Sequence, residues 1–366
     1  MTISESSISK MSVNELLAKL VSFPSLSTRE AELVDWLEEQ LTDTGLVDVE
    51  RVENNLLIHY GEDRPWLLLN SHSDVVPASP DHEGEPFKPV TRKGRMFGRG
   101  TTDAKASSAA MIKAILKLAE EGVKPGGKIT FALTVCEEAA GDQNGMAHLR
   151  TFWGDKKPDA AIVGEPTLLA PCVAQKGLLV IRLKTRGISG HAARVYGENA
   201  IYRMSMALQQ LSEIGFAKEN PYLGPVKITP TVINGGSANN ANPEQCETQV
   251  DIRTIPDIPV KKIINIISES VDAEVIIKSD RLISTGTDPE ETIAVAANKA
   301  SGMQFFGSPT CSDWVFLHDI PTVKLGPGDS QDSHTRNESI SLNQPEKAVQ
   351  VYHDIITDYF SRMKRS

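Results

Sequence analysis

The chain has 366 residues, of which 40% are hydrophobic and 23% are charged, an ordinary composition for a soluble globular protein. Its length favours two domains over one. The 48 Asp and Glu outnumber the 38 Lys and Arg, and the net charge of −10 argues against a nucleic-acid partner bound through its phosphates.

The sequence pattern contains no signal for a membrane or for secretion. No apolar run approaches the length needed to cross a bilayer, and the first residues lack the basic start and apolar block of a secretion signal. The cysteines occur singly, without a CxxC pair, at Cys136, Cys172, Cys246 and Cys311. We therefore expect a reducing, cytoplasmic environment, and neither a disulfide framework nor a zinc ribbon.

The first part of the chain alternates helix-like and strand-like segments. Apolar residues recur at intervals of three and four, which predicts amphipathic helices at residues 12–20, 28–41 and 107–119. Short apolar runs predict buried strands at residues 66–69, 129–135 and 159–163. This alternation is typical of an α/β domain with a mixed, largely parallel sheet.

The middle of the chain has a different pattern. Residues 178–184 and 248–253 alternate apolar and polar side chains, as in a sheet with one face in water, and helix-like stretches lie at 199–211 and 261–271. The α/β pattern then returns, with a helix at 290–300, a strand at 322–325 and a helix at 345–360. We therefore predict an α/β domain, residues 1–176 and 284–366, interrupted by a smaller α+β domain, residues 177–283.

His72 and Asp74 directly follow the strand predicted at 66–69, at the carboxyl end where open α/β sheets place their ligands. Taken alone, this pair is explained as well by a hydrogen-bonded loop as by a metal site. The motif GRGTTD at 98–103 opens the next helix, but it lacks the third glycine of a dinucleotide loop and no GK[ST] follows. What remains is the carboxylate of Asp103 at a helix start, which suits a metal bridge.

Acidic residues and a histidine follow three further predicted strands: Glu137 and Glu138 after the second, Glu165 after the third, and His334 and Glu338 after the last. Each observation is ordinary by itself, since paired acids after a strand most often form a solvated turn. Their repetition at successive strand ends predicts a metal centre.

The residue types indicate which ions this centre would bind. Two imidazoles and several carboxylates, without a thiolate among them, favour zinc, manganese or cobalt over a structural zinc cage. Two divalent ions with three directly bound carboxylates would keep a net positive charge, enough to acidify a water as a bridging hydroxide. A further carboxylate, off the ions, would take the proton as general base.

Taken together, the motifs resemble the M20 family of dinuclear zinc peptidases and deacylases in order and spacing, from His72 to Glu338. They are HxD at 72–74, GxGxxD at 98–103, the Glu pair at 137–138, GEP at 164–166, and GPG at 326–328 leading to His334. The resemblance implies a zinc-peptidase-like catalytic domain and an inserted domain used as a lid and for dimerisation.

The resemblance also implies a role for each residue of the set. His72 and Glu165 would hold one zinc ion, Glu138 and His334 would hold the other, and Asp103 would bridge the two. Asp74 would orient His72, and Glu137 would be the general base.

Inside the insert, the segment GISGHA at 187–192 is similar to the family's lid motif. The resemblance implies that His191 polarises the scissile carbonyl from the partner subunit of a homodimer. Asn242 and Arg253 resemble the lid residues that hold a substrate carboxylate, and Gly328 is expected to contact substrate as well. By themselves, a loop histidine and a surface arginine are more often structural.

The sequence departs from the common family pattern at three positions, none of them a predicted ligand or the base. Cys136 stands where many members have Asp, Ala106 replaces a frequent Gly, and Ser333 replaces a frequent Ala. GPGDS followed by SHT, and SGHAAR around His191, are closer to the acetylornithine deacetylase and acyl-lysine hydrolase branch than to the succinyl-diaminopimelate branch.

We therefore expect a metal-dependent amidohydrolase that removes an N-acyl group, first of all N-acetyl, from an amino acid such as N-acetylornithine. It would use two divalent ions, zinc before cobalt or manganese. N-succinyl-amino-acid desuccinylation, hydrolysis of an acyl-lysine or a carrier-protein lysine, and dipeptide hydrolysis stay open within the same family.

Readings from other classes compete less well. A cysteine hydrolase that uses Cys136 as its nucleophile would give no role to Asp103, Glu138 and Glu165. A serine hydrolase is not supported either, because the sequence contains no GxSxG motif. A non-catalytic binding relative would be expected to have lost a ligand or the base, whereas all are present in this sequence.

Overall fold

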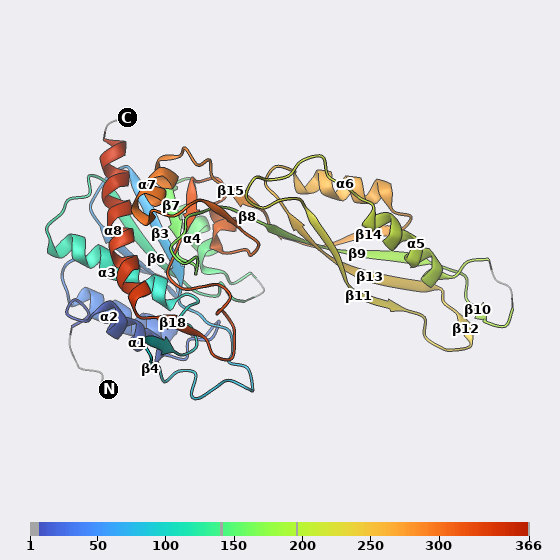
Figure 1. Ribbon diagram of the computed structural model, residues 1–366, viewed down its shortest axis with the longest axis horizontal. Coiled ribbons are helices and arrows are strands. Elements are labelled where there is room, and N and C mark those ends of the chain that lie inside the picture. Colours follow the sequence, from blue (N-terminus) through green and yellow to red (C-terminus); the bar gives the residue numbers. More distant parts are fainter. Residues whose placement is uncertain (1–6, 140–141, 195–196, 365–366) are drawn as a thin grey trace. The chain divides into compact units, whose positions relative to one another are not determined.

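The computed structural model describes residues 7–139, 142–194 and 197–364, and the chain divides into two compact units (Figure 1). The first unit comprises residues 1–173, 287–306 and 312–366, and the second comprises 174–286 and 307–311. We expected residues 307–311 in the α/β domain. They belong to the second unit, where the N–H of Lys176 donates to the carbonyl of Ser308 and Gly307 packs against the backbone of Tyr222.

The first unit is built on a mixed sheet whose four central strands are parallel. In spatial order these are β6 (Lys128–Thr134), β3 (Trp66–His72), β7 (Ala160–Val163) and β17 (Thr322–Lys324). Antiparallel strands flank them, β2 (Asn55–Tyr60) and β1 (Asp48–Val52) beyond β6, and β8 (Cys172–Gln175) beyond β17. The predicted α/β class is confirmed, and the parallel pairing is concentrated at the centre of the sheet.

Helices pack on this sheet to form the core of the first unit. Helix α4 (Gly145–Trp153) and the 3-10 helix η1 (Asp313–Leu317) share one apolar cluster with the sheet residues Leu68 and Ala132. Helix α3 (Lys105–Glu120) packs against β3, α1 (Val13–Val21) and α8 (Asn343–Met363), and α7 (Thr292–Ser301) packs against α8. Figure 1 shows α3 and α8 on one side of β3 and β6, with α4 on the other.

Two smaller features of the first unit lie in segments that lead to predicted site residues. Helix α2 (Ala31–Thr42) begins later than residue 28, where we expected it, because Thr28 has a left-handed φ of 73°. A three-stranded sheet in the order β18 (Ser339–Ser341), β5 (Arg95–Phe97) and β4 (Val90–Arg92) pairs Ser339 with Phe97. This pairing places the 98–103 motif beside the segment that ends at Glu338.

The second unit is an antiparallel sheet covered by two helices. The strand order is β11 (Lys227–Gly235), β13 (Gln245–Thr254), β9 (Gly177–Arg186) and β14 (Glu274–Leu282). Alternate residues of β9 and β13 are buried, as their pattern predicts, and they form a core with α5 (Ala200–Ser212) and α6 (Val260–Ser270).

Short strands complete the second unit. The two-residue strands β10 (Gly190–His191) and β12 (Ala241–Asn242) pair with each other. Two further short strands, β15 (Thr285–Gly286) and β16 (Phe306–Ser308), belong instead to the large sheet, where both pair with β8. Among all helices in the described ranges, none combines the length and the apolar character needed to cross a membrane.

Candidate metal centre

The predicted site residues of the first unit converge at one edge of the central sheet. The four parallel strands end at this edge: His72 is the last residue of β3, Glu137 and Glu138 follow β6, Glu165 follows β7, and His334 follows β17. Because carboxyl ends of parallel strands align, residues far apart in the sequence meet there.

Asp103 reaches the same edge from the turn before α3. Gly100 in this turn has a φ of 87°, and a Cβ at this position would lie 2.7 Å from the side chain of Val75. The turn therefore needs glycine for its backbone conformation and for its close packing.

His72, Asp103 and Glu165 form the first group of possible ligand atoms. The ring of His72 is buried, with Nε2 3.2 Å from Asp103 Oδ1 and 4.0 Å from Glu165 Oε1. On the other side of the ring, Nδ1 lies 3.0 Å from the backbone oxygen of Asp74. Donation from Nδ1 to this oxygen leaves Nε2 of the neutral ring available as a ligand atom.

Asp103, Glu138 and His334 form the second group. His334 Nε2 lies 2.7 Å from Glu138 Oε1 and 3.5 Å from Asp103 Oδ2. The two oxygens of Asp103 therefore face different histidines, Oδ1 facing His72 and Oδ2 facing His334. Within each group the ligand atoms lie within 4.8 Å of one another.

Glu137 lies between these groups. Its carboxylate belongs to a third set of neighbouring ligand atoms, with His72 and Glu138. Burial raises the pKa of Glu137 well above its usual range, and the negative charge of Glu165 adds to the effect, whereas His72 opposes it.

Burial and the crowding of charges shift the pKa values of Glu165 and of the two histidines upwards. Burial, together with the charge of Asp103, raises the pKa of Glu165 to about 8. Burial lowers the pKa of His72, but hydrogen bonds to Asp103 and Asp74 outweigh it, and the pKa lies well above the usual value. The hydrogen bond to Glu138 likewise raises the pKa of His334. Crowded carboxylates and imidazoles without a thiolate are donors that fit divalent zinc, cobalt or manganese.

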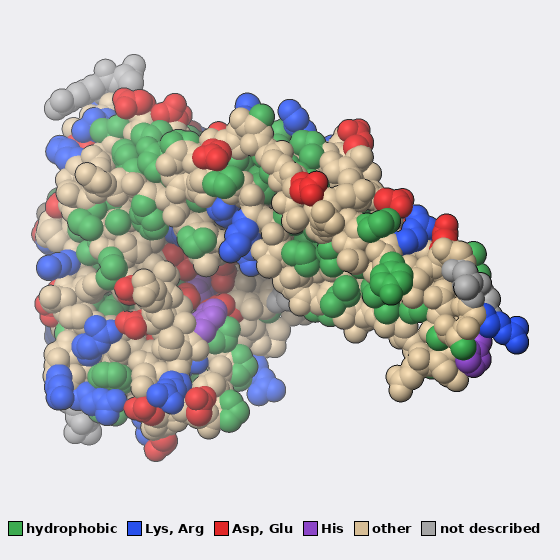
Figure 2. Space-filling view, turned by 45° about the vertical axis from the view of Figure 1, so that its right-hand side comes forward, with side chains coloured by type: hydrophobic (Ala, Val, Ile, Leu, Met, Phe, Trp, Pro, Cys, Tyr) green, Lys and Arg blue, Asp and Glu red, His purple; other side chains and the backbone are tan. Residues whose placement is uncertain are grey.

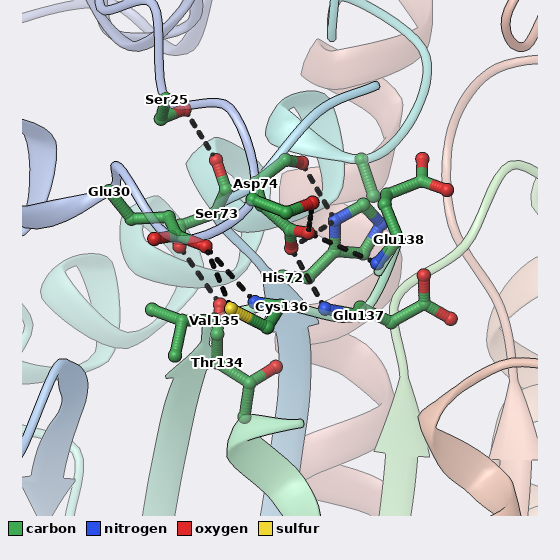
Figure 3. Close-up of polar contacts among 12 residues, drawn as sticks. Ser25, Glu30, His72, Ser73, Asp74, Thr134, Val135, Cys136, Glu137 and Glu138 are labelled. Atoms are coloured by element: carbon green, nitrogen blue, oxygen red, sulfur yellow. Dashed lines mark hydrogen bonds and ion pairs between the residues drawn. The ribbon is translucent and has the colours of Figure 1, made fainter. Parts of the chain in front are cut away.

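Asp74 contacts both the histidine and the glutamate pair (Figure 3). Its Oδ1 lies 3.4 Å from His72 Nδ1. The same carboxylate accepts the backbone N–H of Glu137 on Oδ1 and that of Glu138 on Oδ2, each at 3.0 Å, and the hydroxyl of Ser27 at 2.7 Å. We expected Asp74 to face His72, but its contacts with the backbone of the glutamate pair were not predicted.

Glu338 does not belong to these groups of ligand atoms in the described part of the chain, although its position after a strand suggested a ligand. Its Oε1 accepts the backbone N–H groups of Gly100, Thr102 and Asp103 at 3.0, 2.9 and 3.1 Å. Its Oε2 accepts from Arg99 Nη1 at 2.6 Å, and both side chains are buried. Glu338 therefore fixes the turn that presents Asp103.

Asp313 is a further buried acid that we did not predict. It accepts from Asn144 Nδ2 at 2.7 Å and from Thr134 Oγ1 at 2.8 Å, at the end of β6. Burial raises its pKa, and these hydrogen bonds oppose the shift. No motif surrounds Asp313 in the sequence, so only the fold reveals its place.

The second unit contains three predicted site residues. His191 is exposed in β10, and its Nδ1 accepts the backbone N–H of Ala193 at 3.1 Å. Asn242 donates to two backbone carbonyls, and Arg253 makes a two-pronged ion pair with Asp251 on the same strand. In the first unit, the N–H of Gly328 donates to the side chain of Gln344 at 2.6 Å.

Known proteins resemble this chain in sequence along most of its length. The family model described as peptidase family M20/M25/M40 matches residues 68–358. A succinyl-diaminopimelate desuccinylase of Wolbachia pipientis subsp. Culex pipiens (strain wPip) is 29% identical over 371 residues, covering 94% of this chain and 93% of the relative. An acetylornithine deacetylase of Proteus mirabilis (strain HI4320) is 28% identical over 364 residues, covering 90% and 92%.

Solved structures show the same fold. The aminopeptidase PepT from Bacillus cereus ATCC 10987 superposes with a TM-score of 0.76 at 21% identity, covering 95% of this chain and 98% of that one. A dinuclear metal-binding M20 peptidase from Bacillus subtilis gives 0.70 at 16% identity, covering 94% and 96%.

Proposed function

Because the chain belongs to peptidase family M20/M25/M40, we propose that this amidohydrolase is metal-dependent and removes an N-acyl group from an α-amino acid, with N-acetylornithine as the expected substrate. One observation carries the metal dependence: Asp103 presents one carboxylate oxygen to each of two imidazoles. The GPGDS motif and the similarity to an acetylornithine deacetylase support the choice of substrate. The similarity to a succinyl-diaminopimelate desuccinylase makes N-succinyl amino acids the second candidate.

In this proposal His72 and Glu165 would hold one divalent ion and Glu138 and His334 would hold the other, with Asp103 available to both groups. Zinc is the expected metal, with cobalt or manganese as alternatives. When bound, the ions supply the positive charge that acidifies a water and polarises the scissile carbonyl.

Glu137 is the proposed general base. Its carboxylate neighbours both His72 and Glu138, and Asp74 fixes the backbone from which it projects. In this position it can take the proton of the attacking water and later deliver it to the leaving nitrogen.

His191 is proposed to stabilise the oxyanion. Because Nδ1 accepts the N–H of Ala193, the neutral ring carries its proton on Nε2, which can donate to the developing negative charge. Donors of this kind commonly contribute about 10²–10³ in rate. We propose that His191 acts from the partner subunit of a homodimer.

The surface of the second unit supports the proposed dimer. Strand β11 lies at the edge of its sheet, and large apolar side chains are exposed on it and on α5: Tyr202 (74%), Met206 (54%), Val232 (50%) and Ile233 (56%). Figure 2 shows apolar side chains on the surface of this unit. A second copy of the chain would cover both the edge and the apolar side chains.

A subunit-mixing experiment tests the action of His191 in trans. Subunits with His191→Ala and subunits with Glu137→Gln are each expected to be nearly inactive, and they are allowed to exchange. If His191 acts in trans, the hybrid dimer has one site with both residues intact, and activity reappears. Activity that stays absent, or a fully active monomer, would contradict the proposal.

Arg253 and Asn242 are the proposed contacts for the α-carboxylate of the substrate. Arg253 would exchange Asp251 for the substrate carboxylate, keeping a two-pronged geometry. Asn242 would exchange one of its two backbone carbonyls. Gly328 is proposed to contact the substrate from the first unit.

A hydrolysis panel tests the proposed function. It comprises N-acetyl, N-succinyl and N-formyl derivatives of ornithine, citrulline, lysine, arginine and diaminopimelate, with dipeptides as controls. We expect the highest kcat/KM for N-acetylornithine. Preference for N-succinyl substrates would select the second candidate, and hydrolysis of dipeptides alone would reject both.

A further inference from the structure

Glu30 is a buried acid that the proposed mechanism does not use. It directly precedes α2, and its side chain is 1% exposed and lies beside Cys136 (Figure 3). Its Oε1 accepts the backbone N–H of Thr28 at 3.0 Å and that of Cys136 at 3.1 Å. The thiol of Cys136 is a further donor at 3.4 Å. Since a carboxylate out of water is costly unless donors surround it, these contacts fix Glu30 and the Cys136 backbone together.

Cys136 turns the chain from β6 towards the glutamate pair. Its φ of 55° is left-handed, a conformation that a residue with a side chain keeps only where the surroundings hold it. The next two N–H groups, of Glu137 and Glu138, are taken by Asp74. Three successive N–H groups of this turn therefore donate to two buried carboxylates. The N–H of Cys136 donates to Glu30, and the next two donate to Asp74.

The segment that carries Glu30 is itself tied to the end of β3. The hydroxyl of Ser25 donates to the carbonyl of Ser73, and that of Ser27 donates to Asp74, both at 2.7 Å. The N–H of Val75 returns a hydrogen bond to the carbonyl of Ser25 at 3.0 Å. Glu30 is therefore held at a fixed place relative to the strand end that carries His72.

We infer that Glu30 is a positioning residue, which holds the Cys136 turn in its left-handed form and thereby places the carboxylates of Glu137 and Glu138. The inference rests on the proposed function, in which these carboxylates are the base and a metal ligand. A displacement of about 1 Å at a reacting group can cost about 10² in rate. Displacing Glu138 would weaken one ion site and leave the His72 and Glu165 group unchanged.

Three variants test the inference. Glu30→Ala removes the acceptor, whereas Glu30→Gln keeps an acceptor oxygen at the same reach. Leu33→Ala is the matched control, because it truncates a buried side chain of α2 that lies outside the turn. We expect Glu30→Ala to lower kcat about 100-fold with KM within about twofold. Glu30→Gln should stay within about threefold of the wild type, and Leu33→Ala should keep kcat while losing stability.

Calorimetric titration of the metal-free proteins with zinc measures the number and affinity of bound ions without requiring enzymatic activity. The wild type is expected to bind two ions, and Glu30→Ala to bind one of them normally and the other about tenfold or more weakly. Glu30→Gln should bind both. If the wild type hydrolyses none of the acyl amino acids, the proposed function fails, but the titration still decides the role of Glu30.

Wild-type kcat and two wild-type affinities in Glu30→Ala would overturn the inference. The same losses in Leu33→Ala would also overturn it, since they would then reflect destabilised α2. If Glu30→Ala does not fold, Glu30→Asp replaces it, because it keeps the charge but retracts the oxygens by one methylene. A loss of about tenfold in kcat is then expected, and wild-type kcat and zinc affinities in Glu30→Asp would overturn the inference.

Discussion

The ion pair between Arg99 and Glu338 gives a quantitative test of how the Asp103 turn is held. Glu338→Gln keeps an oxygen for the three backbone N–H groups but removes the charge that Arg99 pairs with. The guanidinium is then buried without its anion, and within the described residues its Nε already has no hydrogen-bond partner. Removing one partner of a buried ion pair costs about 3–5 kcal/mol.

Arg99→Met is the matched comparison. It leaves Glu338 with its three N–H donors, so only one charge-assisted hydrogen bond is lost, at a cost of about 1.5–3 kcal/mol. Because the estimated loss is larger for Glu338→Gln, we expect this variant to be less stable than Arg99→Met. The double variant has neither charge and is expected to be more stable than Glu338→Gln alone.

The assay is thermal unfolding of the metal-free proteins at one scan rate, followed by circular dichroism. For a domain of this size each kcal/mol shifts the midpoint by about 2–4 °C, so Glu338→Gln should unfold about 6–20 °C lower than the wild type. Equal midpoints for the two single variants, or a double variant whose losses simply add, would refute the reasoning.

Three further predictions concern the metal centre and the substrate. Glu137→Gln should keep both ions while kcat falls by orders of magnitude, whereas Glu138→Gln should lose metal; equal metal content by elemental analysis would show that base and ligand are misassigned. A strong chelator should abolish hydrolysis and added zinc or cobalt should restore it, and full activity of a metal-free preparation would rule out the dinuclear site. Arg253→Ala should raise KM for acyl amino acids, while amidated substrates should be poor with either enzyme; equal rates on the amidated substrate would remove Arg253 from this role.

The central sheet could be predicted because its strands are buried on both faces. The apolar runs at β3, β6 and β7 leave little choice of structure, and the residues that follow them then meet at one edge. Strand β11 was missed for the opposite reason. Its side chains are nearly all exposed and it contains Pro230, so it shows neither an apolar run nor a regular alternation.

Buried acids that accept backbone N–H groups could not be predicted in the same way. Glu30 stands at the beginning of an amphipathic helix, where an acid is expected for its charge alone. Glu338 comes after the strand predicted at 322–325 and only four residues beyond His334, so its position suggested one more metal ligand. Their partners lie 106 residues away at Cys136 and 239 residues away at Arg99, and no local pattern reports a contact of that separation.

The acids that hold these turns also change the electrostatics of the ligand groups. Hydrogen bonding to Asp74 contributes to the raised pKa of His72, and the charge of Glu338 contributes to that of His334. Positioning by carboxylates therefore adds negative potential where Asp103, Glu138 and the two histidines meet. Neutral groups in place of Asp74 and Glu338 would hold the same backbone but would add no negative potential, so these two acids both fix the turns and favour positive charge at the centre.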